Sequence, residues 1–405
     1  MRKMIIPFGA IKITAKSKKL IIDCLRKGRI SGGKYVREFE DRFAGIIGAR
    51  EAVAVSSGTD ANILALAVLH DIGSKRGDEV IAPALSFVAT GSAILHAGFT
   101  PVFVDVDPET LNIDPGKIEK AITKRTRAII VAHLMGKPAA MDRIIAIAKK
   151  HNLIVIEDAA EAYGAKYKGK NIGTIGNMGA FSLYVAHIIT TAEGGVILTD
   201  NPRFAEILRS LRAHGRSCKC KQCVLNTTSG FCKKRFSNRK KEDLRFMFER
   251  IGYSCKMNEL EAALGLGNLD LYNEILKKRY NNLKSIMERF KEFSPYLWTF
   301  KEESWERIGP HAFPFVVKKN APFTREKLML YLEQQGIDGR TLFSSIPTQC
   351  GGYEFLGYKA GDFPNAEYIG SNGIHIGVHH EISKKDINYF ISCVRDFINK
   401  REHRR

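Results

Sequence analysis

Short apolar segments rich in β-branched residues alternate with helical patterns through the first two-thirds of the chain. Segments of this length and composition are typical of strands buried on both faces, and the helical stretches between them allow parallel crossovers. The sequence therefore predicts an α/β fold with a mostly parallel sheet covered by helices on both sides. The expected strands lie at residues 51–56, 80–83, 101–105, 128–132, 153–157 and 195–198.

The chain of 405 residues is longer than one simple core needs, which predicts two lobes. The strand–helix alternation ends near residue 259, and a helical stretch at residues 260–290 leads into a smaller mixed region. We expect a large domain at residues 1–259, with a Cys-rich insertion at residues 214–245, and a small C-terminal α/β domain at residues 260–405.

The chain is strongly basic, with 63 Lys and Arg against 43 Asp and Glu and a net charge of +20. Residues 212–245 hold eleven Lys and Arg but two acids, Glu242 and Asp243. No helix-turn-helix, zinc-finger or RNA-binding pattern accompanies this excess, so a nucleic-acid partner is not expected. No apolar run is long enough to cross a membrane and the first residues lack a signal-like core, so we expect a cytoplasmic protein.

The most specific pattern is FSLYVAHIITTAEGG at residues 181–195. It resembles the active-site stretch of the DegT-type sugar-nucleotide aminotransferases, which runs aromatic residue, Ser, four residues, Lys, then a Thr-rich turn ending in Glu-Gly-Gly. The resemblance implies an aspartate-aminotransferase-like fold (pyridoxal-phosphate fold type I) whose large domain binds the cofactor. It extends over nearly the whole chain, through residues 39–40, 104–107, 133–136, 252–257 and 364–367.

His187 occupies the position where this family carries the lysine that binds pyridoxal phosphate covalently. Without an amine there, the resting state of ordinary transamination is lost. An imidazole can still transfer protons near neutral pH, which makes His187 the candidate catalytic residue. A histidine at this position is also compatible with a core residue in an inactive homologue.

Residues 56–62 (SSGTDAN) follow an expected strand and open a helix. The free N–H groups and the dipole at such a helix start suit a phosphate, and glycine lets the backbone approach it closely. A Ser-Gly-Thr turn before a helix is also typical of a simple N-terminal cap. The residues that the resemblance assigns to the cofactor at this end are Gly58, Thr59, Asp60 and Ser182.

The resemblance assigns four more residues to the cofactor. Phe87 would stack on the pyridine ring. Asp158, at the end of an expected strand, would pair with the pyridine nitrogen and keep it protonated, although an Asp there is also typical of a turn cap. Glu161 would lie near the phenolic oxygen. Ser254 stands where many members have an Asn that reaches the partner subunit's cofactor, which implies a homodimer.

Four of the eight cysteines crowd into fifteen residues, Cys218, Cys220, Cys223 and Cys232. In a cytosolic enzyme this density indicates a metal site rather than disulfides. Zinc held by four thiolates and unliganded cysteines are both compatible with the spacing. The flanking Lys and Arg residues favour a [2Fe-2S] cluster, because its four-thiolate form carries net negative charge.

Within the family, a lysine-less branch pairs an active-site His with a Cys-x-Cys-x2-Cys insertion and a later Cys, as in the CDP-4-keto-6-deoxyglucose 3-dehydrases. The gap from Cys223 to Cys232 is one residue longer here. This resemblance implies a pyridoxamine-phosphate-dependent, iron–sulfur C3 deoxygenation of a nucleotide-linked 4-keto-6-deoxy sugar, in deoxysugar or polysaccharide biosynthesis. It also implies an acidic flavin or ferredoxin-type reductase as partner, which a basic surface would suit.

Three other functions stay open at this stage. The first is a redox-neutral 3-dehydratase, also His-based, whose cysteines hold zinc or nothing. The second is a pyridoxal-phosphate sugar aminotransferase, which the missing lysine disfavours. The third is a catalytically silent, metal-stabilised protein that binds a partner through its basic segment.

Overall fold

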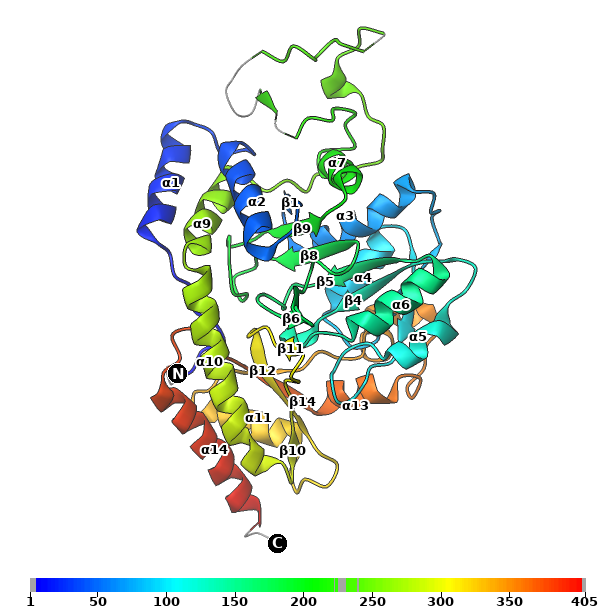
Figure 1. Cartoon of the computed structure of the whole chain (residues 1–405). Coiled ribbons are helices and arrows are strands. Elements are labelled where there is room, and N and C mark those ends of the chain that lie inside the picture. Colours follow the sequence, from blue (N-terminus) through cyan, green and yellow to red (C-terminus); the bar gives the residue numbers. More distant parts are fainter. Residues whose placement is uncertain (1–4, 222, 225–230, 239, 403–405) are drawn as a thin grey trace.

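The computed structural model describes residues 5–402 except 222, 225–230 and 239. Its centre is a seven-stranded sheet in the order β1-β9-β8-β5-β4-β2-β3 (Figure 1). The five strands from β3 to β8 run parallel, which confirms the predicted sheet. The strands are β1 (Glu51–Val55), β2 (Glu79–Pro83), β3 (Thr100–Val104), β4 (Thr126–Ala132), β5 (Ile154–Asp158), β8 (Met178–Ser182) and β9 (Gly195–Thr199).

Strand β9 runs antiparallel to both of its neighbours, β8 and β1. The connection from β8 to β9 is the loop 183–194, which contains no crossover helix, and a chain that turns back directly must pair antiparallel. This topology places the whole 183–194 loop, with His187 in it, at the edge where β8 ends.

Helices cover both faces of the sheet, because alternate residues of each strand point to opposite cores. In β4, Ala128 and Ile130 join one apolar core, whereas Ile129 and Val131 join the other. The first core includes α3 (Gly58–Asp71), α4 (Val88–His96) and α7 (Pro202–Leu211). The second includes α2 (Lys34–Ile47), α5 (Pro115–Ala121), α6 (Met141–His151) and α9 (Glu259–Leu269).

The predicted helical stretch at residues 260–290 is two helices, α9 and α10 (Tyr272–Phe290). Helix α9 packs against α1 (Ala15–Arg26) and α2, whereas α10 runs down to a second, antiparallel sheet (Figure 1). That sheet has the order β10-β12-β14-β13, and Ile6 near the N-terminus forms a bridge to Ile337 beside it. The domain boundary at residues 259–260 stays a prediction.

The remaining elements complete the smaller lobe and the connections to it. A three-stranded sheet in the order β11-β6-β7 joins residues of the two halves of the chain. The elements are β6 (Lys166–Tyr167), β7 (Lys170–Asn171), β10 (Leu297–Trp298), β11 (Glu306–Arg307), β12 (Ala312–Val317), β13 (Gly339–Thr341), β14 (Gly373–Gly377), α11 (Arg325–Gln334), α12 (Ile346–Gln349), α13 (Pro364–Asn372) and α14 (Lys384–Glu402).

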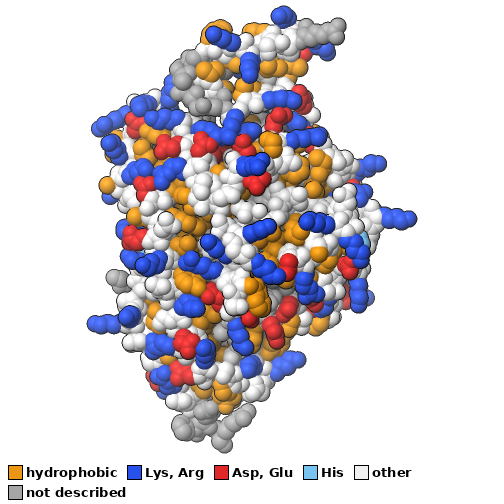
Figure 2. Space-filling view, viewed as in Figure 1, with side chains coloured by type: hydrophobic (Ala, Val, Ile, Leu, Met, Phe, Trp, Pro, Cys, Tyr) orange, Lys and Arg blue, Asp and Glu red, His pale blue; other side chains and the backbone are white. Residues whose placement is uncertain are grey.

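The basic residues are spread over the surface. On the face shown in Figure 2, Lys and Arg side chains lie over the whole molecule with Asp and Glu between them, and further basic side chains project from the extension that follows α7. Within the described part of the chain, every helix is too short or too polar to cross a membrane.

Candidate active site

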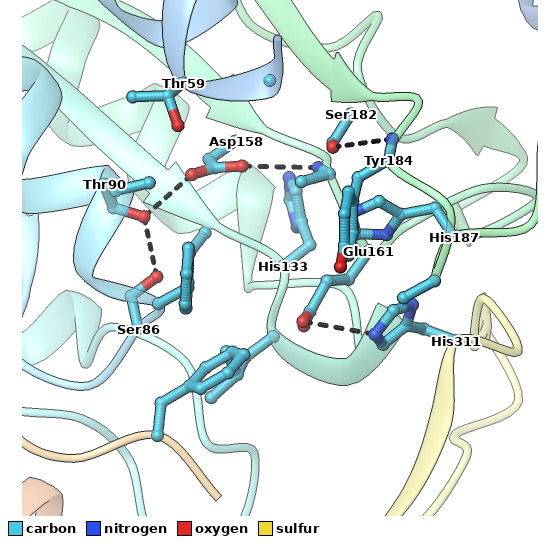
Figure 3. A pocket seen from close by; sticks show the side chains of 18 of the residues that line it. Thr59, Ser86, Thr90, His133, Asp158, Glu161, Ser182, Tyr184, His187 and His311 are labelled. Carbon is cyan, nitrogen blue, oxygen red and sulfur yellow. Dashed lines mark hydrogen bonds and ion pairs between the residues drawn. The ribbon is translucent and has the colours of Figure 1, made fainter. Parts of the chain in front are cut away.

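A cavity of about 600 Å³ opens where β5 and β8 end and α3 begins. Ligands of α/β proteins bind at this carboxyl edge of the strands. The second sheet closes the cavity from the other side with His311, Arg340 and His375. The sequence-predicted residues that line the cavity are Gly58, Thr59, Phe87, Asp158, Glu161, Ser182 and His187 (Figure 3).

The start of α3 forms the predicted anion-binding end of the cavity. Ser57 caps the helix by accepting the Asp60 N–H through its hydroxyl at 3.0 Å. A Cβ at Gly58 would lie 2.6 Å from the Ser182 Cβ, so only glycine allows the turn to sit this close to the end of β8. The first N–H groups of α3 are therefore presented beside Thr59 and Ser182, which suits a phosphate.

Asp60 is the one residue predicted for this turn that does not line the cavity. Its carboxylate instead accepts the hydroxyls of Ser56 and Ser57 at 2.7 and 2.9 Å. Asp60 therefore lies behind the turn, and its predicted contact with the cofactor stays a prediction. Sequence could not show this, because a residue in the first turn of a helix can point either into the site or back along the chain.

Asp158 lies on the floor of the cavity at the end of β5. Its Oδ2 accepts hydrogen bonds from Asn62 Nδ2 and Thr90 Oγ1, both at 2.8 Å. Burial raises the pKa of this carboxyl, so its ionised form needs a cationic partner. The buried Oδ1 of Asn62 has no hydrogen-bond partner among the described residues. A carboxylate and an unpartnered polar atom in one pocket fit a protonated, nitrogen-containing ring such as that of a pyridoxal cofactor.

His133 is a site residue to which the sequence reasoning gave no role. Its Nδ1 accepts the Ala139 N–H at 3.1 Å, so the proton sits on Nε2, which faces Glu157 Oε2 at 3.1 Å. The ring is neutral and fixed in orientation at the cavity wall. The available signals were its place directly after β4, next to the end of β5 where Asp158 lies, and its position in the 133–136 stretch that resembles the family.

Two histidines and a glutamate form the opposite wall (Figure 3). The rings of His187 and His311 have centroids 5.1 Å apart, and His311 Nε2 lies 3.4 Å from Glu161 Oε1. Burial lowers the pKa of His187 to about 3 and that of His311 well below its usual value, so both rings are neutral at neutral pH. A neutral imidazole can accept a proton, so His187 is chemically able to act as a base.

The Glu161 carboxyl is expected to make stability depend on pH. Burial raises its pKa to about 8 in the folded protein, against 4.5 for an ordinary glutamate. The folded state thus holds the proton more strongly, and its contribution to stability is complete below about pH 4.5 and lost as pH rises through about 8. We expect the unfolding free energy of the cofactor-free parent, relative to Glu161→Gln, to fall on the order of 3 kcal/mol between about pH 5 and 8.

Urea denaturation of both proteins at several pH values measures this difference. The Gln variant is the matched control, because it keeps the size and polarity of the side chain but does not titrate. The buried histidines have lowered pKa values, so their contribution to the unfolding free energy rises with pH. They are present in both proteins, so this contribution cancels in the difference. A parent-to-variant difference that stays constant with pH would show that Glu161 is ionised throughout.

Phe87 and Ser254 lie at the margin of the site. Phe87 is 56% exposed, and its ring centroid is 5.4 Å from that of Phe343 at the cavity wall. Ser254 is exposed, forms an isolated bridge with Ala213 and does not line the cavity of its own chain. Its predicted contact with a partner subunit's cofactor stays a prediction.

Three cysteines of the insertion, Cys218, Cys220 and Cys232, lie near one another. Cys218, Cys220 and Cys232 are partly exposed and Cys223 is exposed. Burial and a hydrogen bond with Cys218 raise the pKa of the Cys220 thiol, and Cys232 adds to the effect. Among the described residues, no three His, Cys, Asp or Glu side chains are arranged to hold a metal ion. Residues 222, 225–230 and 239 of the insertion lie outside the described part.

Residues 12–395 match the DegT/DnrJ/EryC1/StrS aminotransferase family. A dTDP-4-dehydro-2,6-dideoxy-D-glucose 3-dehydratase from Saccharopolyspora spinosa is 34% identical, over 97% of this chain and 86% of the relative. The E coli GDP-4-keto-6-deoxy-D-mannose-3-dehydratase with bound hydrated PLP has a similar structure, with a TM-score of 0.85 and 30% identity over 97% of this chain and all of the other.

An aminotransferase from Psychrobacter cryohalolentis is similar as well, with a TM-score of 0.86 and 27% identity over 98% of this chain and all of the other. Dehydratases and aminotransferases therefore share this fold, and the fold alone does not separate the two chemistries. The expected pyridoxal-phosphate fold type I is confirmed. On the extent of these matches, the chain belongs to the DegT/DnrJ/EryC1/StrS aminotransferase family.

Proposed function

We propose that this enzyme removes the C3 hydroxyl of a nucleotide-linked 4-keto-6-deoxy sugar with pyridoxamine phosphate as cofactor. One observation carries the proposal: the described cavity wall contains His187 and no lysine. The cavity therefore offers a proton-transfer group but no amine for a covalent link to the cofactor. Relatives named as 3-dehydratases of dTDP- and GDP-linked keto sugars support the reaction and the substrate class.

Six of the lining residues have a place in this reaction. Bound pyridoxamine phosphate would supply an amine that captures the sugar ketone and a ring that takes up electrons. The turn at Gly58 and Thr59, with Ser182, would bind its phosphate. Asp158 would hold the proton on the ring nitrogen, and Phe87 would cover the ring. His187 would take the proton from the 4′ carbon of the cofactor and deliver it to the departing C3 hydroxyl, which leaves as water.

A reduction experiment tests the absence of a catalytic lysine. The protein is incubated with pyridoxal phosphate, treated with borohydride, digested and analysed by mass spectrometry. We expect non-covalent cofactor and no modified lysine. A lysine carrying the reduced cofactor in stoichiometric amount would make the enzyme an aminotransferase and would contradict the proposal.

We further propose that Cys218, Cys220, Cys223 and Cys232 hold a [2Fe-2S] cluster served by an acidic flavin or ferredoxin-type reductase. The proximity of three of the thiols and the basic residues around them support this proposal. The incomplete ligand arrangement among the described residues favours the second candidate, a redox-neutral 3-dehydratase with zinc or no metal. Both candidates use the same cavity.

We also propose a homodimer, in which Ser254 reaches the partner's cofactor.

Metal analysis of anaerobically purified protein is expected to give about two irons and two sulfides per chain, and Cys220→Ser is expected to abolish the visible absorption. Cys350→Ser is the matched control, because Cys350 is partly exposed as well but lies far along the chain from the insertion. Iron and sulfide below stoichiometric amounts, with or without zinc, would contradict the cluster and leave the redox-neutral reaction.

A further inference from the structure

Glu161, His311 and His187 come from three separate segments of the chain. Their side chains form a row with His187 at one end. Glu161 follows β5, His187 lies in the 183–194 loop, and His311 directly precedes β12. In Figure 3 the Glu161 carboxyl and the His311 ring point at each other, with His187 beside them. Both His187 Nδ1 and His311 Nδ1 are buried and have no hydrogen-bond partner among the described residues. Buried polar atoms without partners are costly, so such a pair at a cavity indicates function.

The backbone around His311 is held firmly. Arg279, which is fully buried in α10, donates to the carbonyl oxygens of Pro310 and His311 at 2.9 and 2.6 Å. The Gly309 N–H donates to the Gly136 carbonyl at 2.8 Å, and a Cβ at Gly136 would overlap Gly309. These contacts hold the backbone around His311 in place. The distance between the His311 ring and Glu161 is therefore set by the fold.

The contacts of Glu161 indicate where its proton lies. Glu161 Oε2 accepts the Met135 N–H at 2.7 Å, which leaves Oε1 to carry the carboxyl proton. With its raised pKa, Glu161 holds this proton at neutral pH, and His311 Nε2, 3.4 Å from Oε1, is placed to accept it. A ring that accepts at Nε2 must carry its own proton on Nδ1. His311 then carries its proton on Nδ1, in a ring whose centroid lies 5.1 Å from that of His187. The other titratable or charged groups that act on the His311 ring are Arg279, Arg340 and His375, Arg279 also acts on the His187 ring, and Asp158 acts on the Glu161 carboxyl.

We propose that Glu161 and His311 are positioning residues for His187: Glu161 fixes the tautomer of His311, and His311 sets which nitrogen of His187 carries the proton. A histidine that takes a proton from carbon and gives it to a leaving hydroxyl needs the same ring nitrogen to be unprotonated in every molecule. A neighbouring hydrogen-bond donor selects that nitrogen. This inference rests on the proposed function, since it gives His187 the role of base.

Nitrogen-15 NMR of the histidine rings tests the inference on protein without cofactor or substrate. In the parent, His311 is expected to be protonated on Nδ1 and His187 to show one tautomer. Glu161→Gln keeps a donor opposite His311 Nε2 and should preserve the His311 tautomer. Glu161→Leu removes the donor and should give a mixture at both rings, with the His311 ring still in place. Finding His311 protonated on Nε2 in the parent, or His187 unchanged in Glu161→Leu, would overturn the proposal.

The second measurement is solvent exchange at the 4′ carbon of bound pyridoxamine phosphate. His311→Phe is expected to slow this exchange about tenfold or more. A positioned base accelerates proton transfer about 10²–10⁴-fold, and loss of its orientation removes part of that acceleration. His70→Phe is the control, since His70 is a partly buried ring stacked on Phe99, away from the cavity. Equal exchange in His311→Phe and parent would overturn the proposal. Because the NMR test needs no turnover, a parent that exchanges no proton would contradict the proposed function and leave the tautomer assignment standing.

Discussion

Replacing His187 with Asn is expected to slow proton exchange at the cofactor's 4′ carbon, and C3 hydroxyl loss with it, by about 10²–10⁴-fold. His187 is a neutral imidazole at the cavity wall, with the His311 ring beside it. Asn fills similar space and keeps polar atoms, but it cannot accept a proton near neutral pH. The rate is measured by following loss of deuterium from labelled pyridoxamine phosphate.

Cofactor affinity is the control for this variant. The phosphate turn at Gly58 and the carboxylate of Asp158 are untouched, so the dissociation constant of pyridoxamine phosphate should change by less than about threefold, or about 0.6 kcal/mol. Exchange at the parent rate in His187→Asn would assign the base to another residue. His187→Lys should in turn form a borohydride-reducible adduct with pyridoxal phosphate, because the residue already lies in the cofactor cavity.

Replacing Asp158 with Asn is expected to lower turnover by about 10²-fold or more while changing the unfolding free energy by about 1 kcal/mol or less. The amide oxygen can still accept the hydrogen bonds of Asn62 and Thr90. The variant loses the long 3.3 Å hydrogen bond from the Ala160 N–H and, above all, the negative charge, which is what keeps the ring nitrogen of the bound cofactor protonated. Single-turnover kinetics and urea denaturation of the same preparation measure the two effects.

Thr90→Val separates the charge of Asp158 from its hydrogen bonds. It removes the 2.8 Å donor to Asp158 but leaves the carboxylate, so its effect on turnover should be smaller than that of Asp158→Asn. Near-parent turnover in Asp158→Asn would show that the carboxyl is structural. A large loss of stability in that variant would show the same, because a carboxyl whose burial raises its pKa should be cheap to neutralise.

The sequence predicted six of the seven strands of the central sheet and seven of the residues that line the cavity, because these rest on local patterns. Strand segments and the turn at Gly58 are visible in a few consecutive residues, and the position of His187 follows from the register of residues 181–195. The break between α9 and α10 was missed, because residues 270–271 interrupt the helical pattern without a glycine or proline.

Asn62, Thr90 and His311 were missed for a different reason. Asn62 and Thr90 lie inside apolar helices, and nothing local shows that their side chains meet Asp158 at 2.8 Å. His311 lies 150 residues along the chain from Glu161, so only the packing of the second sheet against the first brings them together. Contacts between distant segments depend on the tertiary fold and have no signature in one sequence.

The most direct test of the central claim is the product formed in a single turnover. The parent, loaded with pyridoxamine phosphate, is mixed with 4-keto-6-deoxy sugars linked to dTDP, GDP or CDP, and the products are examined by proton NMR and mass spectrometry. We predict that one of these substrates loses its C3 hydroxyl, and that the loss disappears in His187→Asn. A 4-amino sugar with its C3 hydroxyl intact would contradict the account, because it would show transamination in a cavity whose described wall has no lysine.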